Sequence, residues 1–135
     1  MFKLSKKVEY GLIAVKHIAN AGIINPCSAK EIAGKNRIPY DLLSKILQKL
    51  KKEKILVSVQ GIKGGYKLSR SPDKINLATI FNAIEGSNYI LDCGMHEDPL
   101  SCTIFDSCII SSPMQKIQKS IISYFNTTRL SEIVY

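Results

Sequence analysis

A glycine-rich turn between two alternating segments is the feature that most constrains the fold of this 135-residue chain. In ILVSVQGIKGGYKLSR, polar and apolar residues alternate along Ile55–Gln60 and again along Tyr66–Ser69, with Gly61, Gly64 and Gly65 between them. Alternation with a period of two is typical of strands that bury one face, and glycines between two such strands indicate a hairpin. We therefore expect a β-hairpin near the middle of the chain.

Three helical patterns precede the hairpin. The first has apolar residues at helical spacing from Leu4 and ends at Gly22. The second opens at Ser28, and Glu31 follows three residues later, as in a capping box. The third, within residues 38–55, carries an apolar stripe of Leu42, Leu43, Ile46, Leu47 and Leu50. Three helices followed by a hairpin predict a winged helix-turn-helix, a mainly α fold with a small β-wing.

Charge is distributed unevenly between the two halves of the chain. Residues 1–71 carry 15 Lys and Arg against 4 acidic residues, whereas residues 72–135 carry 4 against 7. The net charge is therefore +11 in the first half and −3 in the second, which agrees with +8 for the whole chain. Such asymmetry favours a polyanion as the partner of the basic half, although a solvated basic surface would have the same composition.

Double-stranded DNA is the polyanion that a winged helix-turn-helix is built to bind. In this fold the third helix enters the major groove, where exposed polar side chains read base edges. The candidates on that helix are Tyr40, Asp41, Ser44, Lys45 and Gln48. The hairpin would contact phosphates or the minor groove through Gln60, Lys63 and Lys67. A winged helix used only for protein contact is the alternative, and the basic charge argues against it.

The acidic half contains three of the four cysteines, in LDCGMHEDPLSCTIFDSCII. Eight residues separate Cys93 from Cys102, and five separate Cys102 from Cys108. The N-terminus lacks the long apolar run of a signal peptide, and no apolar stretch approaches the roughly 20 residues that span a membrane. We therefore expect a cytoplasmic protein with no membrane segment. In that reducing compartment clustered thiols are more often metal ligands or redox sensors than disulfides.

Several chemistries are compatible with this cysteine spacing. A zinc site using the three thiolates and His96 is possible, but zinc sites usually contain two ligands only two to four residues apart. A thiol switch requires no particular spacing. An iron–sulfur cluster requires soft thiolate donors on a pliable loop, which Gly94, Pro99 and Ser101 would provide. The residues by themselves leave these possibilities open.

Five segments of the chain resemble the IscR/NsrR family of bacterial transcription regulators, also called the Rrf-two family. They are LSKKVEYGLIAV, IPYDLLSKILQKLKK, VSVQGIKGGYKLSR, INLATIFNAIEG and NTTRLSEIV. The G-x-x-G-G-Y wing is the most specific of them. The resemblance implies a homodimer that binds a near-palindromic operator, with a long C-terminal helix as the dimer contact. It also implies an iron–sulfur cluster held by a three-cysteine loop before that helix.

The segment SSPMQKIQKSIISYFN supports the long helix. Ser112 is expected to cap it and Pro113 to occupy its first position. Four residues then recur at spacings of 3, 4 and 3, which is typical of a coiled-coil seam: Met114, Ile117, Ile121 and Tyr124. We accordingly divide the chain into a DNA-binding domain, residues 1–71, and a region with the sensor loop and dimerisation helix, residues 72–135.

The resemblance also implies the ligands of the cluster. These would be Cys93, Cys102 and Cys108, with Glu9 contributed by the first helix of the other subunit, as in NsrR-like relatives. IscR-like relatives have a histidine where this chain has Ser111, which favours a 4Fe–4S over a 2Fe–2S cluster. The expected signals are nitric oxide, redox state or iron–sulfur status.

Two histidines and the fourth cysteine complete the candidates. His96 is a rival for the fourth ligand position, whereas His17 is expected to be a partly buried helix residue and Cys27 a small core residue. No nucleotide-binding glycine loop or catalytic set is recognisable, so we do not expect an enzyme. The alternative is a cluster-free regulator of the same fold that responds to a thiol switch, a small metabolite or a partner protein.

Overall fold

The computed structural model describes residues 3–86, 103–104 and 107–134. Its first helix, α1 (Lys6–Ala21), begins after Ser5, whose hydroxyl oxygen accepts a hydrogen bond from the Val8 N–H at 3.2 Å. The helix ends at Gly22, where a φ of 86° lies in the region that favours glycine. The predicted end of this helix is confirmed, whereas Leu4 lies before its start and is 47% exposed.

Helices α2 (Ala29–Asn36) and α3 (Tyr40–Lys52) form the helix-turn-helix. The hydroxyl oxygen of Ser28 accepts a hydrogen bond from the Glu31 N–H at 3.1 Å, which confirms the predicted cap of α2. Helix α2 ends at Arg37, which adopts the left-handed conformation with φ 54°. The buried face of α3 consists of Leu43, Ile46, Leu47 and Leu50, with Leu42 half-buried beside it.

The wing consists of the antiparallel strands β1 (Leu56–Val59) and β2 (Gly65–Leu68). A second contact fixes β2 to the segment that leads into α2. The Cys27 N–H donates to the Tyr66 carbonyl at 2.9 Å, and the Tyr66 N–H donates to the Cys27 carbonyl at 2.7 Å. Gly65 has a φ of 151°, and a Cβ at this position would overlap the backbone of Cys27. The third glycine of the wing, Gly65, is therefore required by this close approach.

A short 3₁₀ turn, η1 (Pro72–Lys74), leads into helix α4 (Leu77–Glu85). The side-chain oxygen of Asn76 caps α4 by accepting a hydrogen bond from the Thr79 N–H at 2.8 Å. Helix α4 packs on α1 where α1 carries Gly11, whose lack of a side chain leaves room for the side chain of Ile84.

The long helix α6 (Ser111–Thr127) starts earlier than the sequence predicted. Ser112 and Pro113 lie inside its first turn, so Ser112 is not the cap and Pro113 is not the first helical residue. The Met114 N–H donates to the Ile110 carbonyl at 3.0 Å and closes that turn. The helix tolerates proline here because the first backbone N–H groups of any helix have no partner within it.

The last helix, α7 (Ser131–Val134), returns to the core. The Leu130 N–H donates to the Ile75 carbonyl at 2.7 Å, which ties this end of the chain to the start of α4. Phe125 of α6 packs edge-on against Phe81 of α4, with 4.7 Å between ring centroids. The C-terminal end of α6 is therefore held against the rest of the subunit.

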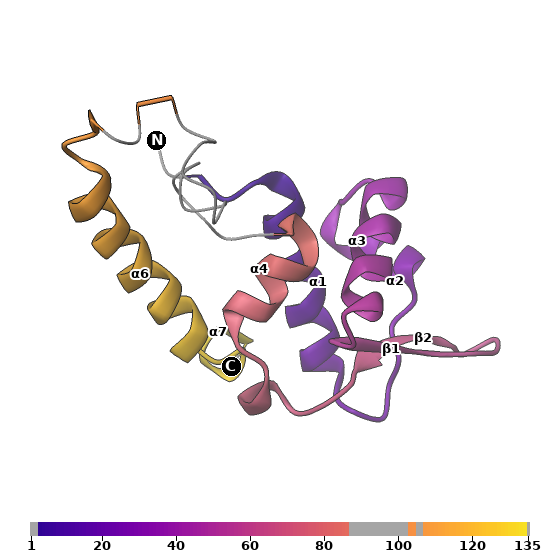
Figure 1. Cartoon of the computed structure of the whole chain (residues 1–135). Coiled ribbons are helices and arrows are strands. Elements are labelled where there is room, and N and C mark those ends of the chain that lie inside the picture. The colour runs from indigo at the N-terminus through magenta and orange to yellow at the C-terminus, as the bar shows by residue number, and fades with distance from the viewer. Residues whose placement is uncertain (1–2, 87–102, 105–106, 135) are drawn as a thin grey trace.

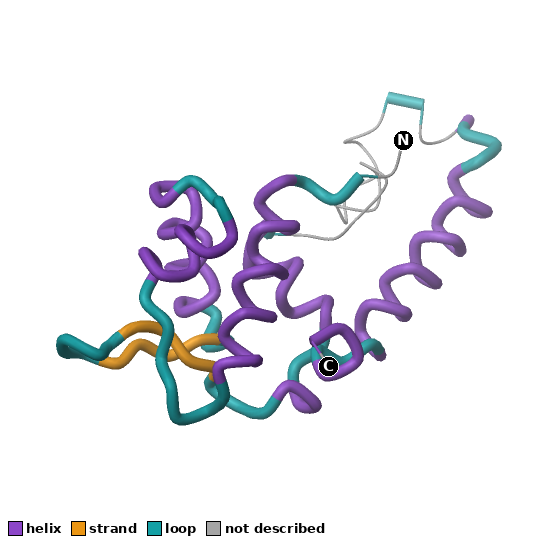
Figure 2. The backbone as a smooth tube through the Cα atoms, turned by 180° about the vertical axis from the view of Figure 1, so that it is seen from behind, coloured by secondary structure: helices purple, strands orange, loops and turns teal. Residues whose placement is uncertain are grey.

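Helices α1 and α4 lie at the centre, with α2, α3 and the wing on one side and α6 on the other (Figures 1 and 2). One hydrophobic core includes residues from both sides of position 71, and the division at 71/72 stays a prediction. The predicted winged-helix fold, mainly helical with a two-stranded wing, is confirmed. Within the described ranges no helix is long and apolar enough to cross a bilayer.

Candidate nucleic-acid interface and sensor region

The candidate base-reading residues lie on the face of α3 that turns away from the core. Tyr40 is 48% exposed, Asp41, Lys45 and Gln48 are also exposed, and Ser44 is half-buried. The face is separated from the buried stripe because α3 is strongly amphipathic, with four leucine or isoleucine side chains packed inward. It presents hydroxyl, amide, carboxylate and ammonium groups, which together can donate to and accept from base edges.

The wing carries its candidate DNA contacts near its tip. Gln60 and Lys63 are exposed in the turn between the strands, and Lys67 on β2 is half-buried. The tip also holds Ile62, which is fully exposed and is not among the residues predicted from the sequence to contact DNA. An apolar side chain at a wing tip can contact sugars or bases in the minor groove, so the tip combines charge with an apolar surface.

A second exposed surface runs along α6 on the other side of the molecule (Figure 1). Of its four predicted seam residues, Ile117 is 50% and Tyr124 66% exposed, while Met114 and Ile121 are half-buried. The apolar surface continues beyond the start of the helix through Ile109 and Ile110, which are 90% and 58% exposed. Apolar side chains at this spacing, uncovered within one chain, are typical of an interface with another chain.

Two of the candidate cluster ligands lie within the described residues. Cys108 is a half-buried free thiol three residues before α6, and its carbonyl accepts a hydrogen bond from the Ser111 hydroxyl at 3.3 Å. Glu9 lies in the first turn of α1 and pairs with Lys6 at 2.8 Å, its side chain 41% exposed. The starts of α1 and α6 lie at the same end of the molecule (Figures 1 and 2). Cys93, Cys102 and His96 lie outside the described residues.

The last turn of α4 connects the start of α1 with α3. The Ser5 hydroxyl donates to the Glu85 carboxylate, and the Lys49 ammonium of α3 donates to the Ile84 carbonyl at 3.2 Å. Glu85 is followed directly by Gly86, the C-cap, with φ 81°. The last described residues before the cysteine-bearing segment therefore contact both the start of α1 and α3.

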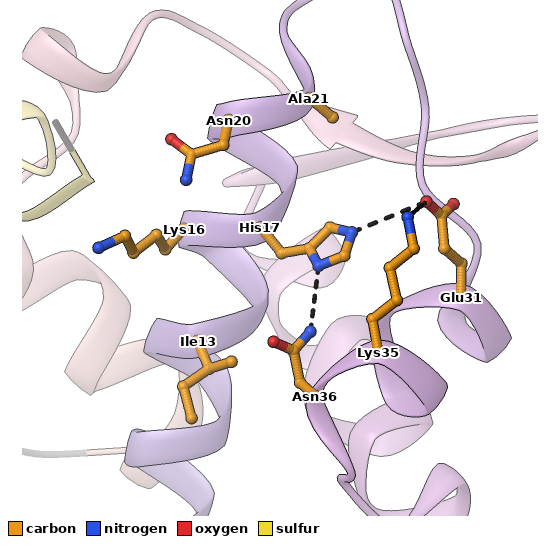
Figure 3. Close-up of a pocket in the computed structure, with 8 residues that line it drawn as sticks. All are labelled: Ile13, Lys16, His17, Asn20, Ala21, Glu31, Lys35 and Asn36. Carbon is orange, nitrogen blue, oxygen red and sulfur yellow. Dashed lines mark hydrogen bonds and ion pairs between the residues drawn. The ribbon is translucent and has the colours of Figure 1, made fainter.

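A further group of ligand-type side chains converges between α1 and α2 (Figure 3). Nδ1 of His17 lies 3.0 Å from Nδ2 of Asn36, and Nε2 lies 3.8 Å from a carboxylate oxygen of Glu31. Lys35 pairs with the same oxygen at 3.1 Å. The thiol of Cys27 completes the group, since ligand atoms of His17, Cys27 and Glu31 all lie within 4.8 Å of one another.

Two of these groups have shifted pKa values. Burial raises the pKa of the Cys27 thiol, and the neighbouring Glu31 carboxylate raises it further. The hydrogen bond from Lys35 lowers the pKa of Glu31. The thiol of Cys27 is therefore protonated at neutral pH, unlike the thiolate of a reactive cysteine.

From the sequence, His17 was expected to be a partly buried helix residue and Cys27 a small core residue, with no connection between them. Cys27 is 2% exposed and His17 is half-buried, which confirms both individual assignments. Their convergence was missed because, although Cys27 and Glu31 are only four residues apart, nothing in the sequence places His17 of α1 beside them. The one local signal was the capping box, which placed Glu31 in the first turn of α2 without indicating what its side chain would face.

Comparisons with known proteins support the winged-helix fold and identify a family of regulators. The sequence profile of the Rrf2 (Rrf-two) family, described as an iron-dependent transcriptional regulator, matches residues 4–135. A protein of Aquifex aeolicus named as an HTH-type transcriptional regulator is 30% identical over 135 residues, covering 96% of this chain and 90% of that protein.

Two solved structures are similar over nearly the whole chain. CymR, the global cysteine regulator of B. subtilis, is 25% identical with a TM-score of 0.74 and covers 99% of this chain and 97% of its own. IscR of T. potens is 26% identical with a TM-score of 0.75, covering 98% of this chain and 86% of its own. The matched proteins named here are regulators and none of them is an enzyme.

Proposed function

This chain belongs to the Rrf2 family of DNA-binding transcriptional regulators, and we propose that it acts as a homodimer whose operator affinity depends on an iron–sulfur cluster. The observation that carries the proposal is the pair of exposed surfaces on opposite sides of the subunit. One is the polar face of α3 with the wing, and the other is the apolar seam of α6 (Figure 1). The first surface suits DNA and the second suits another subunit. As a regulator it would work in the cytoplasm.

The DNA partner is a near-palindromic duplex. Two subunits related by a two-fold axis present two copies of α3, and their targets are successive major grooves about 34–36 Å apart. Lys45 and Gln48 are exposed in the middle of α3 and are proposed to contact bases. Lys63 at the wing tip is proposed to contact phosphates, which contribute affinity without sequence information.

The partner of the α6 seam is a second copy of the chain. Ile117 and Tyr124 expose half or more of their surface. Burying apolar surface stabilises a protein by roughly 25 cal/mol per Å², and this stabilisation is lost if both side chains stay in water. The opposite copy of the same seam would cover them, because a two-fold axis brings identical surfaces together. Helix α6 stands away from α1 and α4 along its N-terminal part (Figures 1 and 2), where Ile110 and Ile117 are 58% and 50% exposed.

The donor set fits an iron–sulfur cluster by its chemistry. Cys93, Cys102 and Cys108 offer three soft thiolates, and Glu9 of the partner subunit would be the fourth ligand. A 4Fe–4S cluster is preferred, because Ser111 replaces the histidine of IscR-like relatives. A bound cluster supplies a redox-active group with iron that nitric oxide and oxidants can attack. The half-exposed Glu9 needs only to leave Lys6 to become available as a ligand.

Two routes connect this site to DNA binding. One crosses subunits, since Glu9 lies on α1, which packs on α3 within the winged helix. The other stays within a subunit, because the last turn of α4 precedes the cysteine-bearing segment and accepts the Lys49 hydrogen bond from α3. A change in the ligand set can therefore alter the orientation of α3 relative to its copy in the dimer.

Anaerobic purification tests the cluster directly. The wild-type protein should be brown or red, with iron and sulfide in equal amounts per chain, whereas Cys→Ala variants at Cys93, Cys102 or Cys108 should lose the colour. Glu9→Ala should keep a more labile cluster but lose the dependence of operator affinity on cluster state. Glu53→Ala, an exposed glutamate at the end of α3, is the matched control and should behave as wild type.

Three outcomes would contradict parts of this proposal. Colourless wild-type protein would contradict the proposal that the protein binds an iron–sulfur cluster. A Glu9→Ala protein with normal spectrum and intact coupling would make Glu9 a surface charge. A colourless His96→Ala protein would indicate that the fourth ligand is His96, within the cysteine-bearing segment, and not Glu9.

Operator binding tests the DNA interface. Affinity should fall steeply with salt, by about 10³–10⁵ between 50 and 200 mM if six to ten phosphates are contacted. Lys45→Ala should change sequence preference, whereas Lys63→Ala should weaken all sequences alike. A flat salt dependence, or the same uniform loss for both variants, would show that the interface lies elsewhere.

A cluster-free regulator of the same fold is the second candidate. The similarity to B. subtilis CymR, named a global cysteine regulator, favours it. In that case a thiol switch, a small metabolite or a partner protein would control DNA affinity. Colour and iron content of the anaerobic protein separate the two candidates.

A further inference from the structure

We propose that His17, Cys27 and Glu31 form a binding site for a thiophilic divalent metal ion, Zn²⁺ in the first instance, within the winged-helix domain. A ring nitrogen, a sulfur and a carboxylate oxygen from three separate segments lie within 4.8 Å of one another. These are the three donor types that zinc uses in proteins. The site is distinct from the proposed cluster site, because it shares no residue with it.

The backbones that carry the three donors are held in place before any metal binds. Cys27 is fixed by its pair of hydrogen bonds with Tyr66 of the wing, at 2.9 and 2.7 Å. Glu31 lies in the first turn of α2, where its N–H donates to the hydroxyl of Ser28. His17 lies in the interior of α1. A donor set on fixed backbones loses little conformational entropy when a metal binds.

The separations are compatible with coordination after a small contraction. Bond lengths of about 2.0–2.3 Å to zinc set ligand atoms roughly 3.3–3.8 Å apart in a tetrahedron. A separation at the 4.8 Å limit would therefore have to shrink by about 1 Å. Glu31, whose side chain is 39% exposed, can move toward the other two donors. Lys35 can keep its ion pair through the second carboxylate oxygen, since a carboxylate accepts on both oxygens.

Asn36 lies where a metal-binding histidine needs a partner. Coordination through Nε2 of His17 leaves the proton on Nδ1, and ligating histidines almost always donate that second N–H. Asn36 already contacts Nδ1 at 3.0 Å (Figure 3). A half-turn of the Asn36 side-chain amide would place its oxygen where it accepts a hydrogen bond from the His17 Nδ1–H. The rotation would break the 2.8 Å hydrogen bond that the Asn36 amide now donates to the Ile32 carbonyl.

The fourth ligand would be water from the adjoining pocket. Lys16, Asn20 and Lys35 line this pocket together with His17 and Glu31, and it opens to solvent between α1 and α2 (Figure 3). Metal binding would release the proton of the Cys27 thiol to water, and the resulting thiolate and the Glu31 carboxylate balance the two charges of the ion. The thiolate also selects zinc, cobalt or copper over magnesium and calcium, which prefer sites made of oxygen atoms alone.

Metal occupancy would link three parts of the DNA-binding domain. His17 belongs to α1, Glu31 to α2, and Cys27 is paired with β2 of the wing. An ion held by all three fixes the helix-turn-helix and the wing relative to α1. Metal binding should therefore stabilise the domain and tighten DNA binding without any contribution from the iron–sulfur ligands.

Cobalt(II) binding to untagged full-length protein tests the site. The background carries Cys93→Ala, Cys102→Ala and Cys108→Ala, so that Cys27 is the one thiol left. Titration should give one Co²⁺ per chain, intense tetrahedral d–d bands and a thiolate-to-cobalt charge-transfer band, all removed by Zn²⁺. Zinc at 100 times its Kd should raise the midpoint of thermal unfolding by roughly 10 °C.

Variants in the same background identify the ligands. His17→Gln and Glu31→Gln should each weaken Co²⁺ binding by more than about tenfold. Removing a residue that only hydrogen-bonds to a metal ligand already costs about tenfold in metal affinity, and removing a ligand should cost more. Cys27→Ala should abolish the charge-transfer band. Glu53→Gln, remote from the site, should leave binding unchanged. These two glutamine variants keep the test decisive if Cys27→Ala fails to fold.

Two results would overturn the proposal: no charge-transfer band with Co²⁺, or equal affinity in the His17, Glu31 and Glu53 variants. The background cannot hold the proposed cluster, so failure here leaves the iron–sulfur proposal standing. Colourless wild-type protein would likewise leave the cobalt result standing.

Discussion

Gly11 of α1 lies directly against Ile84 of α4, and Gly11→Ala tests whether that contact limits the packing of the domain. A Cβ at position 11 would lie well inside 3.0 Å of the Cδ1 methyl of Ile84, a separation that real Cβ atoms do not show. Its next neighbour, Cγ2 of Ile46, would be at an acceptable 3.4 Å. The conflict is thus confined to one methyl group.

Two effects of opposite sign determine how Gly11→Ala changes the free energy of unfolding. Alanine in place of glycine within a helix gains about 1 kcal/mol, whereas overpacking a core costs about 1–3 kcal/mol. Ile84 is 2% exposed and has little room to turn away, so we expect a net loss of about 1 kcal/mol. Ile84→Val deletes the conflicting methyl and should itself cost about 0.5–1.5 kcal/mol.

The double variant separates the steric effect from the others. With the Cδ1 methyl gone, the new Cβ fills the space and keeps its helical advantage, so stability should return to within about 0.5 kcal/mol of wild type. The two substitutions should therefore couple favourably by about 2 kcal/mol. Urea unfolding of all four proteins at one protein concentration measures this coupling. Additive losses, with the double variant about 2 kcal/mol below wild type, would refute the reasoning.

Two further substitutions test the wing and the seam. Gly65→Ala should destabilise the protein by at least about 2 kcal/mol, because its φ is positive and its Cβ meets the Cys27 backbone. Gly34→Ala, in open space on α2, should instead stabilise by about 0.5–1 kcal/mol in the same unfolding assay, and equal effects would reject the close approach. Ile117→Asp should yield monomers in sedimentation experiments, because it puts a charge into the proposed dimer interface. Ser123→Asp, exposed on another face of α6, should remain dimeric, and an Ile117→Asp dimer would place the interface elsewhere.

Signals acting over a few residues made much of the fold predictable. The Ser28 cap, the Gly22 stop and the amphipathic stripe of α3 each depend on hydrogen bonds or side-chain spacing within one or two turns. The glycine turn of the wing is similarly local. The start of α6 was placed wrongly because Ser112 and Pro113 are as acceptable inside a first turn as at its boundary.

The candidate sites were likewise predictable only where a local pattern in the sequence places their residues. The polar face of α3 and the seam of α6 follow from periodicity, because the residues of one helix face share a spacing. The residue types of the cysteine-bearing segment predict a set of metal ligands but not its geometry, since ligand type is a property of the side chain.

Local patterns therefore predicted α1, α2, α3, the wing and α6 in their order, with the exposed faces of α3 and α6, whereas η1, α4 and α7 were not predicted from them. Only the packed structure brings together residues that are distant along the chain: Gly11 with Ile84, Gly65 with Cys27, and His17 with Cys27 and Glu31. Such meetings depend on how helices cross and how closely backbones approach, and these are set by packing of the whole core. No spacing along the chain encodes them.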